Sequence, residues 1–128
     1  MLNQISLIGN VAKISSSRTG GGKLVVSFTV ATNEHWTDGN GERQENAEFH
    51  RCVAFQRGDK EGLAGMLANH LRKGNCVFVQ GKSVTRSWRK AGEDTDRYQT
   101  EVHADTFQFV GPNMDRYELK AAFQTGAK

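Results

Sequence analysis

The stretch DKEGLAGMLANHLR, residues 59–72, decides the fold of this chain. It is the segment in which apolar residues recur three and four positions apart, as on one face of a helix. These positions are Leu63, Met66, Leu67 and Leu71. The cations and the glycine at residues 72–74 are typical of a helix end. We therefore predict a helix that begins at Asp59 as its N-cap, ends at Arg72 and buries His70 along one edge.

On both sides of this helix the sequence alternates between apolar and polar residues, as half-buried strands do. The alternation is clearest over residues 23–32, and glycine-containing turns separate the segments. Gly9 is predicted to break the first strand, and Gly81 is predicted to mark a bulge in the fourth. The five predicted strands cover residues 4–11, 23–32, 47–55, 75–88 and 98–110.

The order of these elements is three strands, one helix and two strands. This is the order of the OB fold. We therefore predict an all-β fold with one helix, in which a five-stranded Greek-key barrel carries the α-helix between strands three and four. The predicted domain covers residues 1–111, and a short C-terminal tail covers residues 112–128.

Composition places the chain among ordinary globular proteins. Its 128 residues carry a net charge of +3, with 37% hydrophobic and 24% charged residues. No apolar run reaches the roughly 18 residues of a membrane helix, and no signal peptide is visible, which predicts a cytoplasmic protein without a membrane partner. Cys52 and Cys76 lie in apolar runs without metal-ligand spacing, so both are predicted to be buried, reduced thiols.

The third predicted strand combines aromatic and cationic side chains on one face. Phe49, Arg51 and Phe55 share this face, whereas the opposite face carries small and sulfur-containing residues that suit a barrel interior. Bases stack on aromatic rings and a guanidinium contacts phosphate, so this face favours nucleic acid as a partner. A subunit interface or a core position is the alternative for both rings.

Both tryptophans lie where long hairpins are predicted. Arg86 and Trp88 share one face of the fourth strand, Arg89 follows them, and Arg97 opens the returning strand. A tryptophan placed among cations on a hairpin favours a binding function over a chance surface position. Trp36 lies at the mouth of the second long hairpin.

Motifs typical of enzymes are missing from the sequence. The glycine-rich residues 19–24 resemble a phosphate loop only in composition, because no Ser or Thr follows the lysine and a strand follows instead of a helix. The four histidines are scattered without ligand spacing. We therefore predict no catalytic residue, no metal site and no cofactor.

Six motifs in the same order resemble the bacterial single-stranded DNA-binding protein family (SSB). They are NQISLIGN (3–10), FTVATNEHW (28–36), EFHRCVAF (48–55), LRKG (71–74), VQG with TRSW (79–81 and 85–88), and DRYQTEV with FQFVGP (96–102 and 107–112). The resemblance covers about residues 2–112. It implies sequence-independent binding of single-stranded DNA in replication, recombination and repair, without enzymatic activity. It also implies a nucleoid-associated homo-oligomer, with a tetramer favoured over a dimer.

The resemblance also assigns roles to individual residues. Base stacking falls to four aromatic residues, which are Trp36, Phe49, Phe55 and Trp88, and Phe49 stands where the family usually has a tryptophan. Phosphate contacts fall to Lys73, Arg86 and Arg97, to which the patterns described above add Arg51 and Arg89.

The end of the chain departs from the family pattern. The family normally ends in a glycine-rich linker and an acidic tip that recruits replication and repair proteins, whereas residues 116–128 hold more cations than acids. We expect a chain that coats DNA without recruiting these proteins, as an accessory copy on a mobile element would. Three alternatives stay open: a dimeric loader similar to primosomal replication protein N, an OB-fold protein-interaction module, and a small metal-dependent nuclease.

Overall fold

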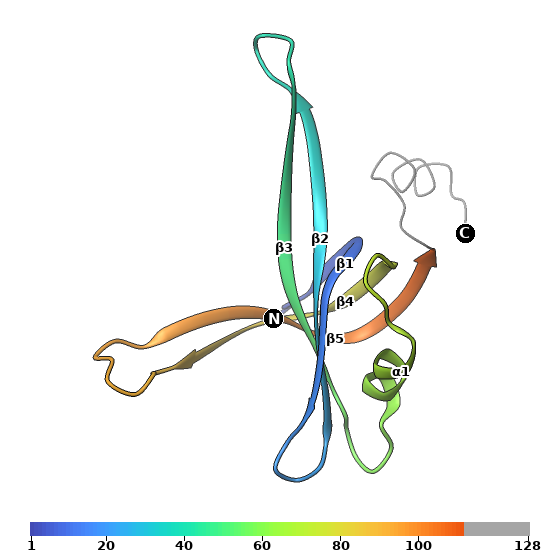
Figure 1. Cartoon of the computed structure of the whole chain (residues 1–128), viewed down its shortest axis with the longest axis vertical. Helices are drawn as coiled ribbons and strands as arrows, with labels where there is room; N and C mark the ends of the chain where they lie inside the picture. The colour runs from blue at the N-terminus through green and yellow to red at the C-terminus, as the bar shows by residue number, and fades with distance from the viewer. Residues whose placement is uncertain (112–128) are drawn as a thin grey trace.

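The computed structural model describes residues 1–111, which form a closed five-stranded barrel with one helix (Figure 1). The elements are β1 (Ile5–Arg18), β2 (Leu24–Thr37), β3 (Arg43–Phe55), α1 (Gly62–His70), β4 (Cys76–Trp88) and β5 (Arg97–Gly111). The predicted fold class is confirmed, including the place of the helix between the third and fourth strands. The predicted tail, residues 112–128, lies outside the described residues.

The strands follow one another around the barrel in the order β1-β2-β3-β5-β4, and β4 pairs with β1 to complete the circle. All pairings are antiparallel except the one between β3 and β5. In that pairing Cys52 lies opposite Val102 and Val53 lies opposite His103. This short parallel contact therefore brings the outer face of β3 next to the outer face of β5.

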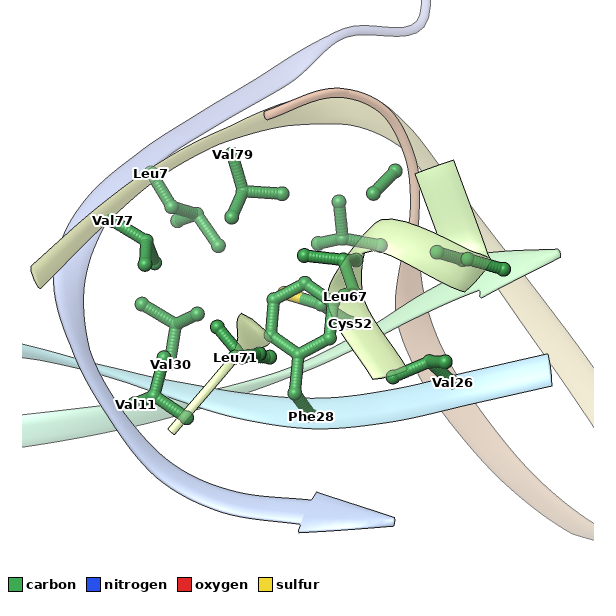
Figure 2. Packing of buried hydrophobic residues seen from close by; sticks show 14 of the residues in the cluster. Leu7, Val11, Val26, Phe28, Val30, Cys52, Leu67, Leu71, Val77 and Val79 are labelled. Carbon is green, nitrogen blue, oxygen red and sulfur yellow. The ribbon is translucent and has the colours of Figure 1, made fainter. Parts of the chain in front are cut away.

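One apolar core fills the barrel. Every second residue of β2 from Leu24 to Val30 points inward and is at most 6% exposed, as the period-two pattern predicted. The helix contributes Leu67, which lies with Cys52 next to the Phe28 ring (Figure 2). Outward-facing positions of the same strands are thereby left for solvent or for a ligand.

Both cysteines are buried, and neither takes part in a disulfide within residues 1–111, which confirms that prediction. Burial raises the pKa of the Cys52 thiol to about 12. Cys52 is therefore a core residue rather than a reactive thiol at neutral pH.

Two long hairpin arms leave the barrel in different directions (Figure 1). The β2–β3 pairing continues without a register shift to Thr37 and Arg43, whereas the sequence predicted strands that end at Thr32 and begin at Ala47. Most side chains of this extension are exposed. The apolar alternation by which a strand is recognised is therefore absent, and the prediction stopped too early. The second arm is formed by β4 and β5 up to the pair Trp88–Arg97.

The helix is shorter than predicted. It begins at Gly62 rather than after an Asp59 cap, and no side chain caps it. Gly62 has a φ of 57°, in the left-handed region, so the helical conformation does not extend back through it. His70, predicted to be buried, is exposed at the last position of the helix.

The two predicted glycine features had different outcomes. The bulge at Gly81 is confirmed by a register shift between Gln80 and Gly81. The break at Gly9 was wrong, because β1 runs through Gly9, which pairs with Val77. A Cβ at Gly9 would lie 2.2 Å from the carbonyl oxygen of Ala31, so the residue allows close strand approach instead of ending the strand.

Replacing Gly81 by alanine should destabilise the barrel. The added Cβ would lie 2.0 Å from the backbone oxygen of His103 and would force the β4–β5 bulge apart. We expect Gly81→Ala to lower the free energy of unfolding by about 1–3 kcal/mol, measured by urea denaturation. Gly20→Ala is the matched control, because a Cβ there meets nothing within 4 Å. Equal unfolding midpoints for the two variants would contradict this account.

Candidate nucleic-acid interface

The four aromatic residues predicted to stack on bases are all on the surface. Trp36 is 48% exposed, Phe49 66%, Phe55 40% and Trp88 39%. Phe49 and Phe55 lie on the outer face of β3, whereas the tryptophans lie on the two different arms. An exposed ring presents a face on which a base can stack. Their role in binding stays a prediction.

The outer face of β3 meets β5 at a buried carboxylate. The side chain of Glu101 is 1% exposed, and its Oε2 accepts a hydrogen bond from Arg51 Nε at 3.1 Å. Its Oε1 lies 2.8 Å from Arg86 Nε and 3.1 Å from His103 Nε2. Two of the predicted phosphate-binding cations, from β3 and β4, are therefore brought together by one acid from β5.

The charge of Glu101 is stabilised by these partners. Burial acts to raise the pKa of its carboxyl, but hydrogen bonds from His103, Arg86 and Arg51 outweigh this, so the pKa lies below its ordinary value of 4.5. The carboxylate is thus ionised at neutral pH. Together with the two guanidinium groups it leaves a local excess of positive charge, and that excess is on the exposed side.

The same network reaches one of the predicted stacking rings. The rings of Phe55 and His103 meet edge to face, with centroids 5.0 Å apart. Because His103 also contacts Glu101, the His103 ring links Phe55 to the buried carboxylate.

An open depression of about 710 Å³ lies against β1, β2 and β3 and the chain that follows α1. Four cations line it, and no carboxylate does; they are Lys13, Arg51, Arg72 and Lys73. The structure thus brings the predicted residues Arg51 and Lys73 to the same depression. A depression with this charge suits a phosphate backbone.

The remaining predicted cations are paired on the surface of the second arm. Arg89 Nε lies 3.1 Å from Asp96 Oδ1, and Arg97 Nη2 lies 2.7 Å from Glu93 Oε1. The hydrogen bond from Arg97 lowers the pKa of Glu93. Exposed pairs of this kind are screened by solvent, so a phosphate can replace the carboxylate at little cost.

Sequence reasoning missed three charged residues of this surface. Glu101 gave no signal of its own, because an acid in an alternating strand is normally solvated. Arg72 was assigned only to the helix end, although it precedes Lys73 directly. Lys13 lay beyond the predicted end of the first strand, whereas β1 continues to Arg18.

Residues 1–111 contain neither a metal-binding cluster nor a membrane-spanning helix. Within this range, no three His, Cys, Asp or Glu side chains come together in a way that could hold a metal ion. No helix in the same range is long and apolar enough to span a membrane.

Comparison with known sequences decides the family. The model of the Single-strand binding protein family matches residues 2–110. The chain belongs to this family. The resemblance inferred from the six sequence motifs is thereby confirmed.

Curated relatives of the SSB family are 36% identical to this chain over the stretch that aligns. Single-stranded DNA-binding protein 1 of Chlorobaculum tepidum is 36% identical over 111 residues, which are 86% of this chain and 65% of the relative. The single-stranded DNA-binding protein of Rickettsia conorii is 36% identical over 108 residues, or 83% of this chain and 68% of the relative. The chain thus spans about two thirds of the length of these relatives.

Solved SSB structures have the same fold. The Plasmodium falciparum SSB in complex with single-stranded DNA superimposes with a TM-score of 0.73 at 31% identity, covering 86% of this chain and 96% of that one. A deletion mutant of the Thermus aquaticus single-stranded DNA-binding protein gives a TM-score of 0.68 at 29% identity, covering 90% and 52%.

The network around Glu101 predicts how stability depends on pH. The folded-state pKa of Glu101 lies below its unfolded value, so its contribution to stability is complete above about pH 4.5 and is lost as the pH falls through the lowered pKa. In Glu101→Gln the free energy of unfolding should therefore fall less steeply between about pH 5 and pH 3 than in the wild type. Urea denaturation at a series of pH values measures this slope.

The matched control is Glu34→Gln, which removes an exposed acid from the β2–β3 arm. Its slope should follow that of the wild type. A slope for Glu101→Gln as steep as that of the wild type would show that the carboxylate is not selectively stabilised in the folded state.

Proposed function

We propose that this chain binds single-stranded DNA without sequence preference and protects it during replication, recombination and repair. The proposal rests above all on the outer face of β3, where the exposed Phe49 and Phe55 flank Arg51 at the wall of a depression lined by four cations. Membership of the SSB family and similarity to a structure solved with single-stranded DNA support it.

In the proposed mechanism, rings bind the bases and cations bind the backbone. Each stacked base contributes roughly 1–3 kcal/mol whatever its identity, because every base has a π face. Each neutralised phosphate adds about −0.7 to the slope of log K against log salt. Duplex DNA is bound less well, because its bases are already stacked on one another.

We further propose that the chain acts as a homotetramer in the cytoplasm, associated with the nucleoid. Phe109, near the end of β5, is 39% exposed and lies outside the proposed stacking set, so it suits a contact between subunits. Sedimentation analysis counts the subunits. A dimer would favour the alternative of a loader similar to primosomal replication protein N.

The function is tested by the tryptophan fluorescence of the full chain during titration with oligo-dT at several salt concentrations. We expect strong quenching that weakens as salt rises, because stacking on Trp36 or Trp88 quenches emission and salt competes for the phosphates. Duplex DNA of equal length is the control. If oligo-dT neither quenches the fluorescence nor binds to the chain, an OB-fold protein-interaction module is favoured instead.

Each single substitution of a stacking ring should weaken the binding of oligo-dT. Trp36→Ala, Trp88→Ala and Phe49→Leu should each reduce the binding free energy by about 1–3 kcal/mol without unfolding the protein, as measured by fluorescence anisotropy of labelled oligo-dT. Leu2→Ala removes an exposed apolar side chain outside both the stacking set and the proposed subunit contact, and should leave the affinity within twofold. Loss of affinity in Leu2→Ala alone would assign the binding to a different face.

A further inference from the structure

We propose that Glu101 is a positioning residue, whose buried carboxylate orients Arg51 and Arg86 so that their free amino groups face the DNA backbone. This inference rests on the proposed function and adds to it a residue that never touches the DNA. An acid in a DNA-binding surface is expected to repel phosphate. Here the acid is 1% exposed, whereas the side chains of its two partners are 43% and 52% exposed.

The geometry separates the two sides of each guanidinium. Arg51 uses only Nε toward Glu101, at 3.1 Å from Oε2. Arg86 places Nε 2.8 Å from Oε1 and donates from Nη2 to Oε2 at 3.2 Å. Within residues 1–111 this leaves both terminal amino groups of Arg51 and one of Arg86 without a hydrogen bond. The two amino groups of Arg51 can bind phosphate in a fixed, forked arrangement, and the remaining amino group of Arg86 offers a further donor.

The strand register explains why one acid reaches both arginines. Glu101 lies opposite Val84, and Arg86 lies opposite Gln99, so Arg86 is the diagonal neighbour of Glu101 on the same face. Arg51 precedes Cys52, the first residue of the parallel β3–β5 pairing, just as Glu101 precedes its partner Val102. The carboxylate therefore links the barrel face of β3 to the base of the β4–β5 arm.

Stability alone does not account for this arrangement. Removing a carboxylate from water is costly, and a buried ionic network is often no more stabilising than apolar side chains of similar volume. A guanidinium that is held at its Nε edge, however, has already lost side-chain conformational entropy. Phosphate binding then costs less, because this entropy does not have to be lost on binding. Orientation of the cations is thus the advantage that Glu101 confers.

The same carboxylate supports a stacking ring. His103 Nε2 lies 3.1 Å from Oε1, and the His103 ring meets Phe55 edge to face. Loss of the carboxylate therefore frees two cations and loosens the contact that holds one ring.

The test compares two Glu→Gln variants in full-length protein, using labelled oligo-dT at several salt concentrations. Glu101→Gln raises the net charge by one, so charge alone predicts tighter binding. Positioning predicts the opposite: affinity about tenfold weaker, because charge-assisted contacts lose their geometry. It also predicts a salt slope smaller by about 0.7 to 1.4, the equivalent of one or two phosphates.

The matched control is Glu93→Gln, which frees Arg97 from a pair on the exposed arm. It makes the same change in charge and should leave affinity equal or slightly higher. Equal or tighter binding by Glu101→Gln, with an unchanged salt slope, would overturn the inference. Failure of the wild-type chain to bind oligo-dT would overturn the proposed function and, with it, this inference.

A second variant guards against loss of folding in Glu101→Gln. Arg51→Lys keeps the net charge and leaves an ammonium partner for Glu101, but it cannot hold the acid with Nε while presenting two amino groups. We expect a severalfold loss of affinity, whereas Arg18→Lys, at an exposed pair with Glu61 outside the proposed site, should bind as the wild type does. Equal affinities for both lysine variants would also overturn the inference.

Discussion

Closure of the barrel through the short parallel pairing of β3 and β5 is the constraint on which the rest of the structure depends. Two residue pairs, Cys52–Val102 and Val53–His103, make this contact. Because it joins the sheet to itself, alternate residues of every strand share one enclosed core, and the exposed edges of an open sheet are avoided. The same pairing sets β3 beside β5 on the outside, which is why Arg51 meets Glu101. The fold and the candidate site thus have one origin.

The arms follow a different physical rule from the barrel. Beyond the core, β2 and β3 remain paired mainly by backbone hydrogen bonds, to which the contact between His35 and Glu45 adds, because most of their side chains are solvated. A two-stranded ribbon is marginally stable by itself, so it needs the barrel at its base. The arms extend well beyond the barrel and leave it in different directions (Figure 1). One arm carries Trp36 and the other carries Trp88. A strand of DNA that contacts both must follow the surface instead of entering one pocket.

Burial patterns determine how far the sequence predicts this structure. The alternation from Leu24 to Val30 and the helical spacing around Leu67 were sufficient for the fold, because each position reports whether it faces the core. The arms lack this alternation of apolar and polar residues, so their strands were predicted too short. For the site, exposed rings and arginines are visible as residue types that do not suit a core. Glu101 was not visible, since its burial arises from partners on β3 and β4 that only the closed barrel brings together.

The distribution of charge, rather than its sum, makes a chain of net charge +3 suited to a polyanion. On the second arm, Arg89 and Arg97 are paired with exposed acids, so in the proposed complex phosphate would compete with these acids. At the depression, no carboxylate is among the lining residues beside Lys13, Arg72 and Lys73, so in the proposed complex phosphate would meet these cations without such competition. Arg51 combines the two cases, because it is paired with an acid and also lines the depression. Its acid, Glu101, is buried, and its two amino groups make no hydrogen bond within residues 1–111. Under the proposed function, a buried acid would therefore fix a cation without cancelling its charge toward the DNA, whereas an exposed acid would compete with the DNA for it.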